Sequence, residues 1–333
     1  MAELFPVIAL VMACATSTPA VPTPTPIREA SYVRIGGIDQ WITIRGASRA
    51  NPVLLIVHGG PGDAQSYFPS WYEAYERDFT VVQWDQRGAG RTFAVNKTSA
   101  PSPELVTADG IEVAEYLERH LAKQKIIVLG HSWGSLVAVG MAQRRPELFA
   151  ACVGTGQVGS FRANLKAQFD FMLSHARAAG DRKKVEQLEA IGTPDPTSAD
   201  QYFSWWSIRN PYMVESDRAW LAHMRELLQT DPKLAAEMEV AGAGMMFSGR
   251  ALVQAMLDTD LPKTAPRLNL PFIVIQGAED MMAPTSVAAA YEAVVEAPMK
   301  KMILIPNAGH FALVTHTREF LAALIENVRP LAS

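Results

Sequence analysis

The clearest chemical signal in the sequence is a serine between glycines, Gly130-His131-Ser132-Trp133-Gly134. It follows the apolar run 126–129 and precedes a helix-like segment, 135–145. A tight strand-to-helix turn presents a serine hydroxyl above a sheet, and the helix amino terminus stabilises developing negative charge. The context therefore predicts that Ser132 is a nucleophile, with a glycine-rich structural turn as the alternative.

A serine hydroxyl is a weak nucleophile at neutral pH, so it needs a general base. His310 closes the loop Asn307-Ala308-Gly309-His310, directly after the strand-like run 301–305. This position fits the chain order Ser, acid, His, and it lies at the carboxyl end of a strand, where open α/β sheets place their sites. His316 is the rival in the same region. The other histidines lie in glycine motifs or helix-like stretches: His58, His131, His120, His175 and His223.

The base needs an acidic partner that fixes its tautomer. Two neighbouring carboxylates, Glu279 and Asp280, follow the strand-like run 272–275 in the loop that starts at Gly277. That loop also lies at the carboxyl end of a strand. Both residues are candidates for the third member of a catalytic triad.

Acyl transfer also requires donors for the oxyanion of the tetrahedral intermediate. The backbone N–H after the nucleophile, that of Trp133, is one candidate. The second donor is expected in His58-Gly59-Gly60-Pro61-Gly62, after the apolar run 53–57. We predict that Gly60 is this donor. Its neighbour Gly59 is the alternative donor and a candidate for contacting the substrate.

The elements around these motifs alternate between strand and helix. A hairpin is expected across Gly36-Gly37, with strands at 32–35 and 41–44. Short apolar runs rich in β-branched residues predict strands buried on both faces at 53–57, 80–84, 126–129, 272–275 and 301–305. Helix-like segments occupy 105–122, 135–145, 285–296 and 318–328. This order predicts an α/β fold with a mainly parallel, doubly wound sheet.

The alternation stops between about 159 and 261, where the sequence is helical in period and rich in Met and aromatic residues. We interpret this segment as a helical cap inserted into a core domain formed by 31–158 and 262–333. Trp205 and Trp206 are candidates for lining a substrate pocket, although such clusters are more often core. Glu215 is a candidate for binding a substrate amine, as are three further acids of the segment, which otherwise form solvated helix faces: Asp217, Glu237 and Glu239.

The composition excludes some classes of protein. With 30 Lys and Arg against 34 Asp and Glu, the formal charge of -4 gives no global attraction for nucleic acid. Two cysteines are too few for a disulfide framework and lack the grouping of a zinc site. Hydrolysis through an acyl-enzyme on serine needs no metal or organic cofactor, and we expect none. The expected partner is a small-molecule or short-peptide substrate.

The first thirty residues differ from the rest. Residues 1–15 contain a short apolar run that suits a signal peptide or lipoprotein leader, with Cys14 as a possible lipid anchor, but a basic start is missing. Residues 16–30 are rich in Thr and Pro and predict an extended linker. Export or membrane anchoring and a cytoplasmic location both remain open.

The glycine motif 58–62, the segment Asp85-Gln86-Arg87-Gly88-Ala89-Gly90-Arg91-Thr92, the motif around Ser132 and 307–310 together resemble the proline iminopeptidase family of α/β-hydrolases. The resemblance covers the core domain. It implies a triad of Ser132, Asp280 and His310, because the family places its acid three residues after the glycine that Gly277 matches. It also implies oxyanion donors at Gly60 and Trp133, and a structural role for residues 85–92.

We therefore expect a serine hydrolase that cleaves a small amide or ester through an acyl-enzyme, with removal of an N-terminal residue from a peptide as the activity that the resemblance implies. The cap lacks the Glu-rich segment with which peptidases of this family recognise a free amine. An esterase or amidase that needs no free amine is therefore the alternative, and a ligand-binding protein without turnover is a remote one.

Overall fold

A computed structural model describes residues 25–332 of the chain. The predicted leader, its Cys14 and most of the predicted linker lie outside the described residues. Eight strands form one sheet with the order β1-β2-β4-β3-β5-β6-β7-β8. The strands are β1 (Ile27–Ile35), β2 (Ile38–Gly46), β3 (Val53–Val57), β4 (Thr80–Trp84), β5 (Ile126–His131), β6 (Phe149–Thr155), β7 (Phe272–Gly277) and β8 (Lys300–Ile305).

The sheet is parallel from β4 to β8 and antiparallel only where β2 joins β1 and β4. Strands β3 to β7 are buried along their whole length. That burial explains why they are continuous apolar runs in the sequence instead of alternating ones. The predicted α/β fold with a mainly parallel, doubly wound sheet is confirmed.

Strand β1 corrects the predicted linker, which was expected to extend to residue 30. The strand begins at Ile27, which is 5% exposed and pairs with Gly46 of β2. Most other positions of β1 are partly or fully exposed, so the strand shows no buried apolar alternation. Its conformation depends on backbone pairing with β2. The pattern of apolar and polar side chains in the sequence does not reveal such pairing.

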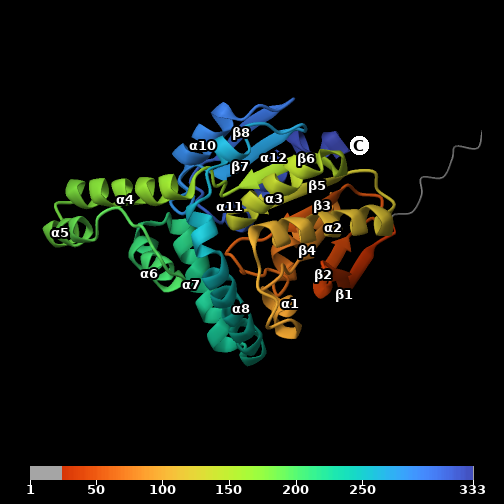
Figure 1. The fold of residues 1–333 in the computed structure, drawn as a ribbon, viewed down its shortest axis with the longest axis horizontal. Helices are drawn as coiled ribbons and strands as arrows, with labels where there is room; N and C mark the ends of the chain where they lie inside the picture. Colours follow the sequence, from red (N-terminus) through yellow and green to blue (C-terminus); the bar gives the residue numbers. More distant parts are fainter. Residues whose placement is uncertain (1–24, 333) are drawn as a thin grey trace, which may run out of the picture.

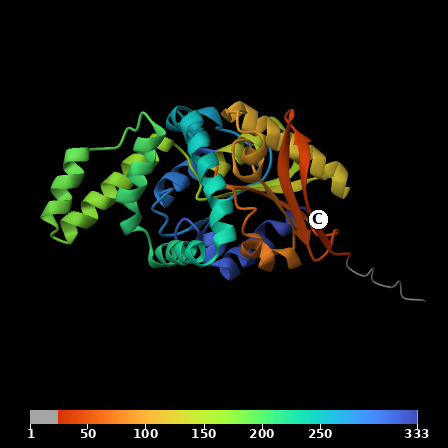
Figure 2. The ribbon, with the colours of Figure 1, turned by 90° about the horizontal axis from the view of Figure 1, so that it is seen from below.

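Helices cover both faces of the sheet. The sheet separates the core into two apolar clusters, and successive side chains of β3 point into opposite ones. Val53, Leu55 and Val57 belong to the first cluster, and Leu54 and Ile56 belong to the second. Helices α2 (Pro103–Leu121) and α3 (Trp133–Arg144) contribute to the first cluster, and the 3-10 helix η1 (Pro69–Arg77) and α12 (Thr317–Asn327) to the second. Figure 2 shows these two helical layers on opposite sides of the sheet. The remaining short elements of the core are α1 (Gly90–Val95), η2 (Pro146–Leu148), α9 (Leu261–Thr264), α10 (Thr285–Val294), α11 (Ala312–Thr315) and η4 (Arg329–Ala332).

Between β6 and β7 the chain forms a helical insertion, at the place where the sequence predicted a cap. Its helices are α4 (Phe161–Ala178), α5 (Arg182–Ile191), α6 (Ala199–Arg209), η3 (Asn210–Tyr212), α7 (Glu215–Thr230) and α8 (Pro232–Leu257). Helices α4 and α5 project away from the sheet, while α7 and α8 lie beside the core (Figures 1 and 2). That the insertion is a separate cap domain remains a prediction.

Candidate active site

Ser132 directly follows strand β5, and α3 begins at the next residue. Ser132 has φ 55° and ψ −121°, a conformation that non-glycine residues rarely adopt. A Cβ at Gly134 would lie 2.0 Å from the carbonyl oxygen of Val57, so only glycine lets α3 approach β3 this closely. The backbone N–H of Ser132 donates to the carbonyl of Thr155 at 2.9 Å. The sharp turn predicted for a nucleophile is therefore present.

His310 pairs with Asp280, and both side chains are buried. The His310 Nδ1 lies 2.9 Å and 3.1 Å from the two carboxylate oxygens of Asp280. Asp280 Oδ1 also accepts from the backbone N–H groups of Met282 and Ala283, at 2.8 Å each. A carboxylate fixed in this way places the proton of the neutral imidazole on Nδ1, so Nε2 is the atom free to act as a base.

The structure separates the candidate acids and bases that the sequence left open. Glu279 is exposed, whereas Asp280 contacts His310. The ring of His316 lies 3.0 Å from the hydroxyl of its neighbour Thr315 and is not part of the pair. The geometry favours the pair that the resemblance implied.

The backbone around His310 is held by α7 of the insertion. Asp217 accepts from the N–H of His310 at 2.7 Å and from that of Phe311 at 3.4 Å. Burial raises the pKa of Asp217 to about 6. Trp220, one turn further along α7, stacks on Phe311 with ring centroids 4.4 Å apart. The sequence placed Asp217 among the possible amine-binding acids. In the structure Asp217 instead holds the backbone of His310 and Phe311 in place.

The glycine loop after β3 lies against Ser132. A Cβ on Gly59 would lie 3.1 Å from the Cβ of Ser132. The segment 85–92 supports this arrangement, because Gln86 donates from Nε2 to the His58 carbonyl at 2.8 Å and accepts from the Trp133 indole at 3.2 Å. Among residues 25–332, no hydrogen bond uses the backbone N–H of Gly60 or of Trp133. Both N–H groups are thus available to an oxyanion.

Ser132, His310 and Gly60 line one cavity of about 260 Å³, which we call the active-site cavity. No hydrogen bond joins Ser132 to His310 in the described part of the chain, and such contacts often tighten only when substrate binds. Most of the remaining lining is apolar and comes from the insertion and from the core loops: Phe68, Trp71, Trp206, Trp220, Leu221, Met224, Leu228, Met238, Met245, Met282 and Phe311. His131 and Asp63 complete it.

The residues predicted to bind substrate occupy different places. Trp206 lines the active-site cavity, but Trp205 is buried behind it and donates its indole N–H to Gln168 at 2.6 Å. Glu215 is exposed and pairs with Arg218, outside the cavity lining.

Asp63 was missed in the sequence. It is partly buried, it lines the active-site cavity with Ser132, and burial raises its pKa to about 6 despite the opposing influence of His310. An acid directly after the glycine loop was the available signal.

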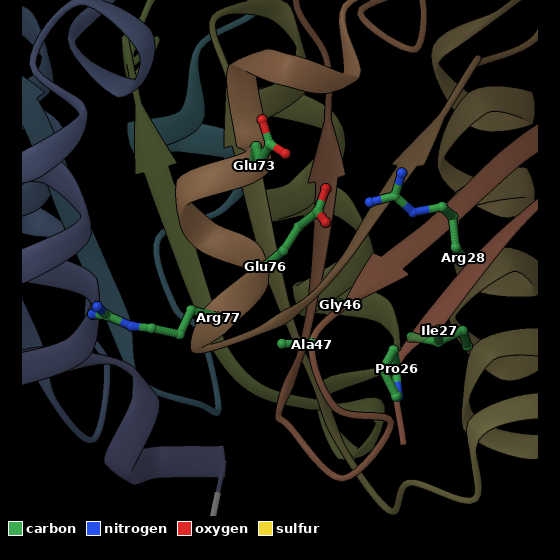
Figure 3. Close-up of a pocket in the computed structure, with 8 residues that line it drawn as sticks. All are labelled: Pro26, Ile27, Arg28, Gly46, Ala47, Glu73, Glu76 and Arg77. Carbon is green, nitrogen blue, oxygen red and sulfur yellow. The ribbon is translucent and has the colours of Figure 1, made fainter. Parts of the chain in front are cut away.

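A larger cavity, of about 390 Å³, lies at the outer strands and contains none of the predicted site residues. Figure 3 shows Glu73 and Glu76 of η1 on one side of it and Arg28 of β1 on the other. Glu76 there pairs with Arg45 at 2.5 Å. Its lining contains no serine, histidine or cysteine, so this cavity cannot supply the Ser-His pair that the sequence predicts.

Comparison with known proteins decides the family. The family model described as "alpha/beta hydrolase fold" matches residues 52–317. The chain belongs to this family. It is 27% identical to the probable aminopeptidase YbaC of Bacillus subtilis over 93% of this chain and 99% of that protein. It is 26% identical to a proline iminopeptidase of Clostridioides difficile, over 89% and 96% of the two chains.

Among solved structures, the proline iminopeptidase-related protein of Thermus thermophilus is similar, with a TM-score of 0.63 and 21% identity over 92% of this chain and 99% of that one. This likeness supports the fold. Together the comparisons bear out the resemblance to proline iminopeptidases and support hydrolase activity in this member of the family.

Proposed function

We propose that the protein is a serine hydrolase that removes an N-terminal residue from short peptides. His310 Nε2 takes the proton of the Ser132 hydroxyl as its oxygen attacks the scissile carbonyl, and the N–H groups of Gly60 and Trp133 bind the oxyanion. The protonated histidine then gives its proton to the leaving amine. Water, deprotonated by His310, hydrolyses the acyl-enzyme and restores the Ser132 hydroxyl.

One observation carries the aminopeptidase assignment: Asp63 is the acid that lines the active-site cavity together with Ser132. A substrate amine is separated from its scissile carbonyl by one carbon, so its counter-charge must lie close to the nucleophile. A carboxylate in an apolar cavity binds an ammonium group more strongly than one in water. The names of the relatives agree with this assignment.

The apolar cavity wall favours the second candidate, an esterase or amidase. The acids of the insertion that the sequence offered for amine binding do not line the active-site cavity, and Glu237 lies 3.4 Å from Arg91 instead. If Asp63 does not bind amines, the remaining lining suits an uncharged ester or a blocked amide.

A panel of chromogenic substrates separates the two candidates. We would compare a prolyl anilide with a free amine, its N-blocked form and short-chain nitrophenyl esters, in the wild type and in Asp63→Asn. An aminopeptidase prefers the free amine, and Asp63→Asn should reduce that preference by about ten-fold or more, because hydrogen bonds to charged groups contribute about 1.5–3 kcal/mol. Equal effects of Asp63→Asn on blocked and free substrates would contradict the assignment.

The catalytic residues have their own controls. Ser132→Ala should abolish turnover of every substrate, and Asp280→Asn should lower kcat by about 10⁴ because the imidazole then takes the wrong tautomer. Glu279→Gln is the matched control, since it neutralises the neighbouring exposed carboxylate and should leave activity unchanged. Activity that survives in Ser132→Ala would refute the mechanism.

A further inference from the structure

A small second cavity meets the active-site cavity at Ser132. It measures about 20 Å³ and shares Ser132, Trp206 and Met282 with the larger one. Its inner wall is formed by the insertion, with Arg209 at the end of α6 and Asn164 on α4. We call it the arginine pocket. Its small volume admits only a compact group at the tip of a substrate.

Arg209 is unusual because its charge is buried without a partner. The residue is 2% exposed, yet no carboxylate within residues 25–332 forms an ion pair with it. Its Nε and Nη2 are buried and have no hydrogen-bond partner. Burial lowers the pKa of Arg209, but a guanidinium remains charged in proteins. A buried, unpaired charge is strongly unfavourable, so such a group needs another reason to be there.

The polar neighbours of Arg209 do not satisfy it. Tyr202 and Asp280 favour the charged form only through space. The oxygens of Asp280 are used by His310 and by two backbone N–H groups, as described above. Gln168 uses its amide on Trp205 and on the Met282 carbonyl, at 2.6 Å and 2.7 Å. Trp206 offers only its ring face, whose centroid lies 5.6 Å from the Arg209 Cζ.

A second buried arginine of the same protein shows what the free donors can bind. Arg87 donates from Nε to one oxygen of Asp109 at 2.8 Å and from Nη2 to the other at 2.9 Å. Nε and Nη2 form one edge of the guanidinium, and this edge matches the two oxygens of a carboxylate. The donors that lack a partner in Arg209 are the same two atoms.

We propose that Arg209 binds a carboxylate of the substrate next to the scissile bond. This inference rests on the proposed hydrolase function, and it names the substrate class as short amides or esters that carry an acid group. The carboxylate can belong to the acyl part, as in the monoester of a dicarboxylic acid, or to the leaving part, as at the C-terminus of a dipeptide. In both cases it enters the arginine pocket while the scissile carbonyl lies at Ser132.

Two substrate comparisons test the proposal and separate the two sources. Mono-nitrophenyl esters of four- to six-carbon dicarboxylic acids are compared with neutral esters of equal length, after subtraction of spontaneous hydrolysis. Prolyl-glycine is compared with its C-terminal amide. We expect one acid-bearing member to be preferred in kcat/KM by the wild type. In Arg209→Met this preference should fall by about ten- to a hundred-fold, the range for hydrogen bonds to charged groups.

Controls distinguish substrate binding from support of the triad. Arg250→Met removes an exposed arginine of the same insertion and should keep the preference. Arg209→Lys keeps the charge but loses the edge formed by Nε and Nη2, so its preference for the acid-bearing substrate should fall several-fold. This variant keeps the proposal testable if Arg209→Met does not fold. A uniform loss of activity on acidic and neutral substrates would overturn the proposal, because it would mean that Arg209 acts only through Asp280.

A binding measurement separates this inference from the proposed function. Succinate and glutarate should raise the Tm of Ser132→Ala, and the rise should vanish in Ser132→Ala combined with Arg209→Met. Binding without turnover of any substrate would refute the hydrolase function but support the pocket. Turnover with no binding and no acid preference would refute the pocket alone.

Discussion

The backbone of Ser132 permits a quantitative test of the strained turn. With φ at 55°, an L-residue here carries strain of about 1–3 kcal/mol, which glycine does not. Glycine in turn loses about 0.5–1 kcal/mol more conformational freedom on folding than alanine. Comparing Ser132→Gly with Ser132→Ala removes the hydroxyl in both cases, so the difference isolates the backbone. We expect Ser132→Gly to be more stable than Ser132→Ala by about 1 kcal/mol.

Urea unfolding followed by circular dichroism measures this difference, and thermal unfolding should show it as roughly 2 °C in Tm for a chain of this size. Both variants should lack turnover because both lack the hydroxyl, so the comparison between them concerns the backbone alone. If Ser132→Gly is less stable than Ser132→Ala, the turn is not strained, and the reasoning that links its geometry to a functional role fails.

Three further predictions concern other positions. The pKa of Asp217 is about 6 in the folded protein, against an ordinary value of 3.8. The folded state therefore favours protonated Asp217, and this contribution to the free energy of unfolding is present below pH 4 and is lost as the pH rises to 6. Asp217→Asn should therefore flatten the fall of unfolding free energy between pH 4 and 6, by at most about 1.4 kcal/mol per pH unit; an unchanged slope in urea titrations would contradict this. Because the pKa of Asp63 is also about 6, the preference for free-amine over blocked substrates should weaken as the pH falls below 6, and kinetics of Asp63→Asn should show no such change. Gly134→Ala would place its Cβ 2.0 Å from the Val57 carbonyl, so we expect little folded protein, and a normal Tm would mean that α3 can shift away from β3.

The core of the fold and the positions of the candidate triad residues were predictable because local sequence specifies them. Buried parallel strands are continuous apolar runs, and a nucleophile turn needs glycines at fixed positions around Ser132. His310 and Asp280 follow strands directly, so the topology brings them together. The choice between Asp280 and Glu279 depended on a family pattern, since both residues occupy the same loop.

The roles of the insertion were not predictable in the same way. Asp217 contacts His310 across 93 residues of sequence, and helical periodicity does not say which acid of a helix faces the core. The same holds for Arg209, because nothing near it in sequence indicates a buried guanidinium. Trp205 and Trp206 are adjacent, yet only Trp206 reaches the active-site cavity. These distinctions depend on how the helices pack against the sheet.

The bond between Asp217 and the backbone of His310 links two properties that are usually treated separately. Helix α7 lines the active-site cavity and also anchors the segment that carries His310, the proposed general base. Any displacement of α7 that admits a bulky molecule therefore disturbs proton transfer as well. A chimera that receives the insertion of another hydrolase would need to supply an acceptor at this point, or it would gain a new specificity at the expense of its rate.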